Sequence, residues 1–209
     1  SYGDSPYQSC STFAGNHYLI DLDMLVEEGL LKEEELTAIE WCDRENKVNY
    51  GTLYQNRLKV LRLAYGRFES NEEFLRFCRE NDSWLSDFAL FMALKDANGG
   101  KPWYQWDTPL KTRDPNAVWE ARRKLRDEAI KARKPDAMRQ ARLKLWKEIS
   151  FYSFVQYLFY KQWTALRAYA RKNGVQIIGD VPIYVPYDSV EVWSEPELFQ
   201  LGEQLEPKV

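Results

Sequence analysis

The chain has 209 residues, of which 44% are hydrophobic and 29% are charged, and its formal net charge is −3. These values predict a soluble globular protein of one or two domains and exclude an intrinsically disordered one. The sequence contains no run of about 18 apolar residues, the length that a membrane-spanning helix needs. The first ten residues lack the basic and apolar segments of a signal peptide.

The cysteines and the histidine restrict the possible chemistry. Cys10, Cys42 and Cys78 are odd in number and have no CxxC spacing, so we expect neither a disulfide framework nor a zinc site, and a reducing compartment such as the cytoplasm fits best. His17 is the single histidine, which excludes a multi-histidine metal site and favours a packed or loop residue over a catalytic base. No phosphate-binding loop and no GxSxG motif is present.

The first part of the chain is predicted to be a loop followed by amphipathic helices. Residues 1–15 are rich in Ser, Gly, Tyr and Pro, which is typical of loops. The spacing of apolar residues then predicts three helices, over residues 22–29, 32–45 and 52–68. Asp21 is a suitable cap for the first helix, and Ser70 followed by Glu73 matches a capping box that starts a fourth.

The middle of the chain is predicted to be helical around one loop. An apolar, buried helix is expected over residues 83–97 and should end at Gly99 and Gly100. Residues 101–113 are expected to form a loop, after which Asp114 and its following proline provide a helix start. A long basic helical stretch follows, and Pro135 divides it into two helices.

A short strand is predicted near the C-terminus. The last long helix should stop at Asn173-Gly174, and residues 175–185 read VQIIGDVPIYV, a β-branched apolar run. This order is the helix-to-strand step of a parallel sheet or barrel. Because one parallel strand cannot form a sheet by itself, the strand indicates that the chain is part of something larger.

Three features each have a structural and a functional interpretation. Aromatic residues make up 15% of the chain, which fits a ring-rich core or exposed platforms for sugar rings. Asp180 lies in the predicted strand, where it either caps the following turn or contributes to an active site at the end of a barrel strand. Residues 1–8, SYGDSPYQ, form an ordinary turn or a loop that presents its rings to a ligand.

The basic stretch does not have the pattern of a nucleic-acid site. Residues 111–148 contain 13 Lys and Arg against 6 Asp and Glu. The positive charges are mixed with acids and are not interleaved with exposed aromatics, which favours a solvated helical face. We therefore expect no nucleic-acid partner and no membrane.

Three blocks of sequence resemble the amylomaltases, the 4-alpha-glucanotransferases of the alpha-amylase clan. The blocks are SYGDSPYQSCSTFAGNHYLIDLDMLVEEGLL at the start, NDSWLSDFALFMALKDANGGKPWYQWD at 81–107, and GDVPIYVPYDSVEVWSEPELFQL at 179–201. They occur in the family's order and cover nearly the whole chain.

The resemblance implies a fold. The family has a (β/α)8 barrel, also called a TIM barrel, with helical insertions, so this chain is expected to be mainly α: a helical insertion region with one or two barrel strands and an incomplete barrel. The expected parts are an active-site-type loop after a barrel strand (1–20), a helical insertion subdomain (21–148), and a barrel helix, strand and following loop (149–209).

The resemblance also implies an activity. Members cut an α-1,4 bond in a maltooligosaccharide and transfer the glucan segment to the 4-hydroxyl of another sugar. The mechanism is retaining, with a carboxylate nucleophile and a second carboxylic acid that switches from acid to base. No cofactor is needed, and the expected partners are maltooligosaccharides or α-glucan.

Four substrate-binding residues follow from the family's motifs. Tyr7 and Ser5 match the loop tyrosine and serine nearest the scissile sugar. Tyr2 matches an aromatic residue that supports glucan binding at a secondary surface. Asp180 matches the strand aspartate on the floor of the donor site, where it would bind the sugar or orient its neighbours.

The catalytic carboxylates of the family have no match in this chain. The nucleophile belongs to an Arg-x-Asp-His block on a later strand, and the acid/base glutamate and a third aspartate come later still. His17 and Pro186 are further departures, in positions where a proline and a small residue are common. The resemblance therefore implies a segment of a cytoplasmic glucanotransferase that is inactive alone.

A second hypothesis is a complete, non-catalytic glucan-binding or helical interaction module. Its platforms would be the tyrosine-rich N-terminal loop and the loop that holds Trp103 and Trp106. If the chain is instead a segment of the enzyme, unpaired barrel edges and uncovered apolar surface would favour its self-association.

Overall fold

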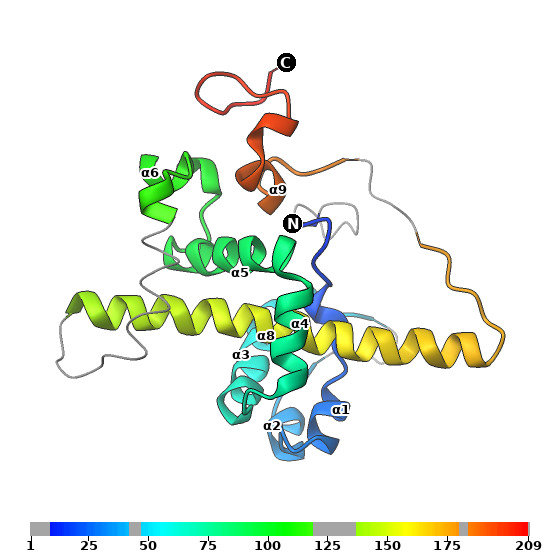
Figure 1. The fold of residues 1–209 in the computed structure, drawn as a ribbon. Coiled ribbons are helices and arrows are strands. Elements are labelled where there is room, and N and C mark those ends of the chain that lie inside the picture. Colours follow the sequence, from blue (N-terminus) through cyan, green and yellow to red (C-terminus); the bar gives the residue numbers. More distant parts are fainter. Residues whose placement is uncertain (1–8, 42–46, 119–136, 180–183, 209) are drawn as a thin grey trace. The chain divides into compact units, whose positions relative to one another are not determined.

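The fold is described by a computed structural model, which covers residues 9–41, 47–118, 137–179 and 184–208 (Figure 1). Of residues 137–145 only the backbone is described. The chain forms two compact units. Unit 1 comprises Ser1–Ala14, Asn81–Ser153 and Ile178–Val209, and unit 2 comprises Gly15–Glu80 and Phe154–Ile177.

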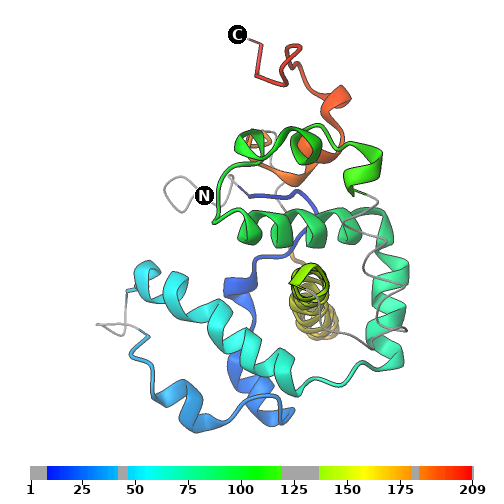
Figure 2. The ribbon, with the colours of Figure 1, turned by 90° about the vertical axis from the view of Figure 1, so that its left-hand side faces the viewer.

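Helices make up the regular structure of the described residues, which confirms the prediction of a mainly α chain. The α-helices are α1 Leu22–Glu27, α2 Glu33–Thr37, α3 Tyr50–Arg67, α4 Glu72–Glu80, α5 Asp82–Ala97, α6 Thr108–Lys111, α8 Ala137–Lys172 and α9 Val190–Ser194. The 3-10 helices are η2 His17–Leu19, η3 Trp103–Gln105 and η4 Pro196–Leu198. Helix α8, seen almost end on in Figure 2, continues from one unit into the other. No described helix has the length and apolar character needed to cross a membrane.

Unit 2 contains the predicted N-terminal helices, with two changes at their ends. Asp21 caps α1 as predicted, because its carboxylate accepts from the amide N of Asp23 at 2.9 Å. Helix α2 is shorter than predicted, and the indole of Trp41 donates at 3.1 Å to the carbonyl of Leu36 in its last turn. The cap of α4 is Asn71 rather than Ser70, since the Asn71 side chain accepts from the Phe74 amide at 2.9 Å.

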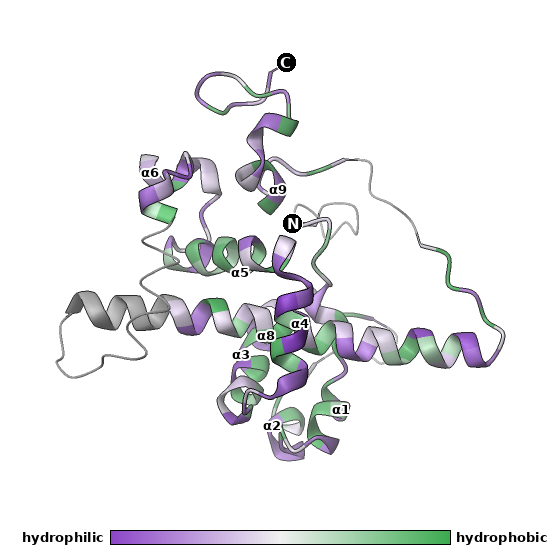
Figure 3. Ribbon diagram, in the orientation of Figure 1, coloured by the Kyte–Doolittle hydropathy of each residue, from purple (hydrophilic) through white to green (hydrophobic). Residues whose placement is uncertain are grey.

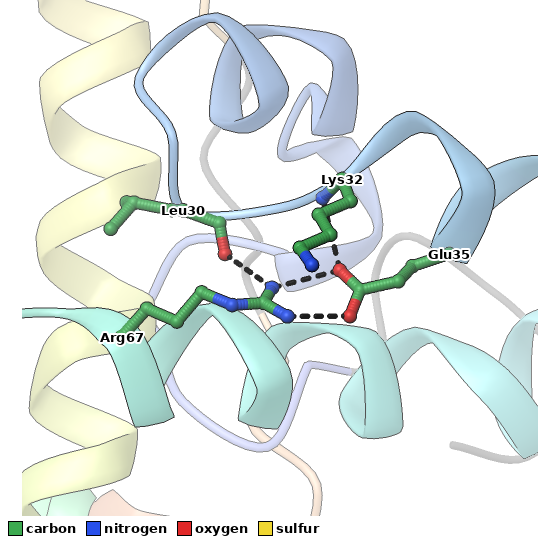
Figure 4. Close-up of polar contacts among 4 residues, drawn as sticks. All are labelled: Leu30, Lys32, Glu35 and Arg67. Atoms are coloured by element: carbon green, nitrogen blue, oxygen red, sulfur yellow. Dashed lines mark hydrogen bonds and ion pairs between the residues drawn. The ribbon is translucent and has the colours of Figure 1, made fainter.

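An ion pair joins α2 to the end of α3 (Figure 4). The two guanidinium nitrogens of Arg67 lie 2.6 and 2.8 Å from the two carboxylate oxygens of Glu35. Arg67 also donates to the carbonyl of Leu30 at 3.0 Å, and Glu35 accepts from the amide of Lys32 at 2.9 Å. These hydrogen bonds lower the pKa of Glu35 to about 2, those from Arg67 having the largest effect. Through these contacts, the turn that precedes α2, at residues 30–32, is held against the end of α3.

The core of unit 2 forms where α3 packs on the second half of α8. Val60, Leu61 and Ala64 are buried on α3. The ring of Phe154 on α8 lies 4.6 Å from that of Phe68 and 5.4 Å from that of Tyr65. Burial of these rings and branched side chains is the main stabilising term of this unit.

Unit 1 is built around α5, which is buried over much of its circumference as predicted. Apolar residues predominate along it (Figure 3), and seven of its residues are buried: Leu85, Phe88, Ala89, Leu90, Phe91, Ala93 and Leu94. The helix ends at Gly99 and Gly100, with φ of 66° and 77°. The Gly100 amide donates to the Lys95 carbonyl at 2.8 Å. Positive φ favours glycine at these two positions and confirms the predicted stop.

The segment after α5 differs from its prediction. Residues 101–113, expected to be a loop, contain the short helices η3 and α6. Asp114 caps the next helical turn as predicted, because its carboxylate accepts from the amides of Asn116 and Ala117 at 3.0 and 2.9 Å. The predicted break at Pro135 lies outside the described residues.

The predicted strand over residues 175–185 is wrong where the structure describes it. Helix α8 stops at Gly174 as predicted, with a φ of 72°. Residues 175–179 and 184–185 then have no strand conformation. A parallel strand exists only by pairing with neighbours, and the described residues supply none for it; their one β-type pairing is an isolated antiparallel bridge between Leu201 and Pro207. Ile178 is consequently 93% exposed.

Candidate functional site

The four predicted substrate-binding residues, Tyr2, Ser5, Tyr7 and Asp180, lie outside the described residues. The segments that follow them are described, at 9–14 and 184–194, and both belong to unit 1. The candidate site is therefore described through these two flanking segments and the residues that hold them.

The two flanking segments are joined directly. The Val190 amide donates to the Cys10 carbonyl at 2.9 Å. One carboxylate oxygen of Glu191, on α9, accepts from the Ser11 hydroxyl at 2.7 Å, the Thr12 amide at 2.8 Å and the Thr12 hydroxyl at 3.1 Å. The segment after the N-terminal loop is thus fixed to the first turn of α9. Two segments about 180 residues apart in sequence meet here.

Helix α9 is held in turn by an aromatic cluster. Trp193 is 1% exposed, and its ring lies 5.6 Å from Phe91 and 5.7 Å from Trp106. Its indole donates to the Leu110 carbonyl at 2.9 Å. The guanidinium of Arg113 lies 4.6 Å from the ring centroid, a cation–π contact. The cluster gives the candidate site a rigid base.

Polar contacts join the residues before α9 to the segment after α5. The ammonium of Lys95 is paired with the carboxylate of Asp188, which also accepts from the Trp103 amide at 3.3 Å. The Trp103 indole donates to the Tyr187 carbonyl at 2.7 Å. The rings of Tyr187 and Tyr104 stack, with centroids 4.5 Å apart and planes at 10°.

The proposed platform around Trp103 is wrong, because its tryptophans are core residues. Trp103 is 0% exposed and Trp106 is 4% exposed. Neither ring has a free face for a ligand, and both support the segment 187–193 instead. The ring-rich core is the correct interpretation for this loop.

The described groups around the candidate site have structural rather than reactive roles. Burial raises the pKa of the Cys10 thiol, an effect larger than the opposing one of the Lys95 charge, so the thiol stays protonated near neutral pH. Asp188 is engaged by Lys95, and Glu191 by Ser11 and Thr12. Within the described ranges no group of three His, Cys, Asp or Glu residues could hold a metal ion.

Unit 2 carries a row of tyrosines that the sequence reasoning did not single out. The rings of Tyr18 and Tyr54 lie 5.6 Å apart, and those of Tyr54 and Tyr50 lie 6.2 Å apart. Tyr50 and Tyr54 are 45% and 47% exposed. Exposed phenol rings can stack on the apolar face of a sugar. The predicted helix over residues 52–68 included Tyr54 but not Tyr50, because α3 begins two residues earlier, at Tyr50. The available signal was the spacing of four residues between the two tyrosines, which places both on one face of a helix.

His17 is packed, as predicted, and is not placed to act as a base. Its ring lies 4.1 Å from that of Tyr18, and its Nε2 is buried without a hydrogen-bond partner among the residues that the structure describes. Arg57 donates to the carbonyls of Tyr18, at 2.8 Å, and of Ile20. Burial and, to a lesser extent, the Arg57 charge lower the pKa of His17 to about 4.

The buried neutral histidine predicts a pH dependence of stability. The unfolded chain binds a proton at His17 below about pH 6.5, whereas the folded chain does so only below about 4. The His17 contribution is therefore fully present above pH 6.5 and is lost as the pH falls toward 4, by about 3 kcal/mol in total. In urea titrations over this range, we expect the unfolding free energy of the wild type to fall relative to that of His17→Gln, because glutamine does not titrate. A difference that is constant between pH 7 and pH 4.5 would contradict the prediction.

Comparison with known proteins identifies the family. A model of the 4-alpha-glucanotransferases, glycoside hydrolase family 77, matches residues 1–130 and 125–205. The 4-alpha-glucanotransferase of Clostridium butyricum is 40% identical over 210 residues, which are 99% of this chain and 39% of that protein. That of Thermus thermophilus is 42% identical over 214 residues, which are 100% of this chain and 38% of that protein.

A solved structure shows the same fold. The amylomaltase from Streptococcus agalactiae, in complex with acarbose, superimposes with a TM-score of 0.83 at 38% identity, covering 99% of this chain and 39% of that one. The chain thus spans slightly less than two fifths of the length of these relatives. The matched residues include both flanking segments of the candidate site. The chain therefore belongs to the 4-alpha-glucanotransferase family.

Proposed function

We propose that this chain is a segment of a 4-alpha-glucanotransferase that transfers α-1,4-glucan segments between maltooligosaccharides. The observation that carries the proposal is the match in sequence and fold over 99% of the chain to an amylomaltase that holds acarbose. The longer enzyme would complete a TIM barrel around the helical insertion. Its mechanism would be a retaining double displacement, with nucleophile and acid/base contributed by residues of the longer enzyme outside this segment.

The segment would supply part of the donor site. Tyr7 and Ser5 would contact the scissile sugar, Asp180 would bind the sugar at the donor-site floor, and Tyr2 would support glucan at a secondary surface. The junction of Cys10 and Val190 supports this assignment, because it joins the segments that follow these residues. We also propose the division into 1–20, 21–148 and 149–209 and a cytoplasmic location.

The activity is tested with maltotriose. The 209-residue chain and the longer protein that contains it are each incubated with the sugar, and glucose and longer oligosaccharides are measured. We expect the longer protein to produce both and the 209-residue chain to produce neither. Glucose release by the 209-residue chain contradicts the inactive segment. A longer protein that binds maltotriose without converting it favours a glucan-binding module, and a coding sequence that ends at Val209 removes the enzyme proposal.

We expect the isolated chain to self-associate. Several large apolar side chains at and after the end of α8 are more than half exposed: Leu166 at 54%, Tyr169 at 68%, Val175 at 57% and Ile178 at 93%. An enzyme barrel would cover such side chains, and without it they favour association. Light scattering should therefore show a mass above 24.8 kDa that rises with concentration. Leu166→Lys together with Ile178→Lys should lower that mass, and a wild-type monomer at 100 μM would refute the expectation.

A further inference from the structure

The segment from Gly15 to Asp21 is bound at both ends to helix α8. At its start, Gln156 accepts from the Gly15 amide at 2.8 Å and donates to the Gly15 carbonyl at 3.1 Å. At its end, Gln162 accepts from the Asp21 amide at 2.8 Å and donates to the Asp21 carbonyl at 3.0 Å. Side-chain amides do not titrate, so acid leaves these two attachments unchanged.

The middle of this segment, the short helix η2 and the residue after it, is held by a cation of α3. The guanidinium of Arg57 donates to the carbonyls of His17, at 3.4 Å, and of Tyr18, at 2.8 Å. It also donates to the carbonyl of Ile20. One guanidinium thus binds three carbonyls of a single turn, between the two ends that α8 holds.

His17 places an ionisable group beside that guanidinium. Its Nε2 is buried and has no hydrogen-bond partner in the described part of the chain. A protonated imidazole carries an N–H at both nitrogens, so acid would add a buried donor without an acceptor and a second positive charge near Arg57. Burial and the Arg57 charge both oppose protonation of the folded turn. By linkage, protonation therefore opposes the folded turn.

The other titratable groups near this pair do not offset the new charge. The phenols of Tyr18, on η2, and of Tyr54, on α3, are neutral in acid. The carboxylate of Asp21 attracts Arg57, but it is engaged in capping α1, where it accepts from the Asp23 amide at 2.9 Å. From α8, the segment meets the two glutamine amides, which carry no charge.

We propose that η2 is an acid-sensitive latch: protonation of His17 releases the turn from Arg57 while both ends of the segment stay bound to α8. Opening separates the ring of Tyr18 from that of Tyr54 and so disrupts the row of tyrosines on unit 2. The latch is closed above pH 6.5 and opens increasingly as the pH falls toward 4. The proposal is independent of the glucanotransferase function.

Amide hydrogen exchange of the 209-residue chain, expressed as protection factors, tests the latch. The Leu19 amide donates to the Asn16 carbonyl within the turn, and its protection should fall about fiftyfold between pH 7 and pH 4.5. This factor follows from a His17 pKa of about 4 in the closed turn and 6.5 in the open one. Protection of the Gly15 and Asp21 amides should change less than threefold. Unchanged protection at Leu19, or an equal fall at Gly15 and Asp21, overturns the proposal.

Two substitutions of His17 remove the titration and serve as controls. His17→Gln has no group that binds a proton in this range. His17→Pro suits the first position of a helix, where the missing amide N–H is not needed. In both variants the protection of Leu19 should change less than threefold between pH 7 and pH 4.5. A fiftyfold fall that persists in His17→Gln would assign the effect to another group and overturn the role of His17.

The holding role of Arg57 is tested at pH 7. Arg57→Met removes the guanidinium but keeps a long side chain, and it should lower the protection of Leu19 at least tenfold. Lys59→Met, which replaces an exposed cation of the same helix, is the matched control and should change that protection less than twofold. Full protection of Leu19 in Arg57→Met overturns the latch. If Arg57→Met does not fold, the His17 variants decide the proposal.

Discussion

Trp193→Ala is expected to destabilise the chain by about 3–5 kcal/mol, the range for truncating a buried aromatic side chain. Trp193 is 1% exposed and contacts the rings of Phe91 and Trp106. Alanine would leave a cavity, remove the cation–π contact with Arg113 and leave the Leu110 carbonyl without its indole donor. Urea unfolding followed by far-UV circular dichroism measures the change.

A neighbouring residue provides the control for Trp193. Leu198, five positions further on, is 70% exposed, and its replacement by alanine should change the unfolding free energy by less than about 0.5 kcal/mol. Trp193→Phe keeps ring packing and loses the indole donor, so an intermediate effect is expected. Equal stabilities of Trp193→Ala and Leu198→Ala would show that the aromatic cluster does not support α9.

Gly15→Ala is the second substitution with a large expected effect. A Cβ atom there would lie 1.9, 2.2 and 2.3 Å from three ring carbons of Phe159. The ring or the backbone must move, and the backbone is held because Gln156 accepts from the Gly15 amide at 2.8 Å and donates to its carbonyl at 3.1 Å. We expect a loss of about 1–3 kcal/mol, the range for overpacking a core, measured by urea unfolding.

Gly66→Ala is the matched control for Gly15→Ala. Gly66 lies in α3, and a Cβ there would meet no atom within 4 Å. Alanine in a helix is favoured over glycine, so this variant should be more stable than wild type by about 0.5–1 kcal/mol. A destabilising Gly66→Ala, or a neutral Gly15→Ala, would show that the close approach of Phe159 does not decide the outcome.

Local sequence signals determined where most helices begin and end. Asp21, Asp114, the Gly99-Gly100 pair and Gly174 act as predicted. Caps and glycine stops work through hydrogen bonds and φ angles within a few residues. The predicted cap at Ser70 was wrong by one position, because the side chain of the neighbouring Asn71 accepts from the Phe74 amide.

The family and the mainly helical class were also determined by the sequence by itself, because long ordered motifs and apolar periodicity are properties of the chain alone. Tertiary structure decided what depends on distant partners. It buried Trp103 and Trp106 and left residues 175–179 without strand pairing. It also brought Glu191 to Ser11 across 180 positions. Burial, strand pairing and long-range hydrogen bonds depend on which surfaces meet, and no local pattern encodes those contacts.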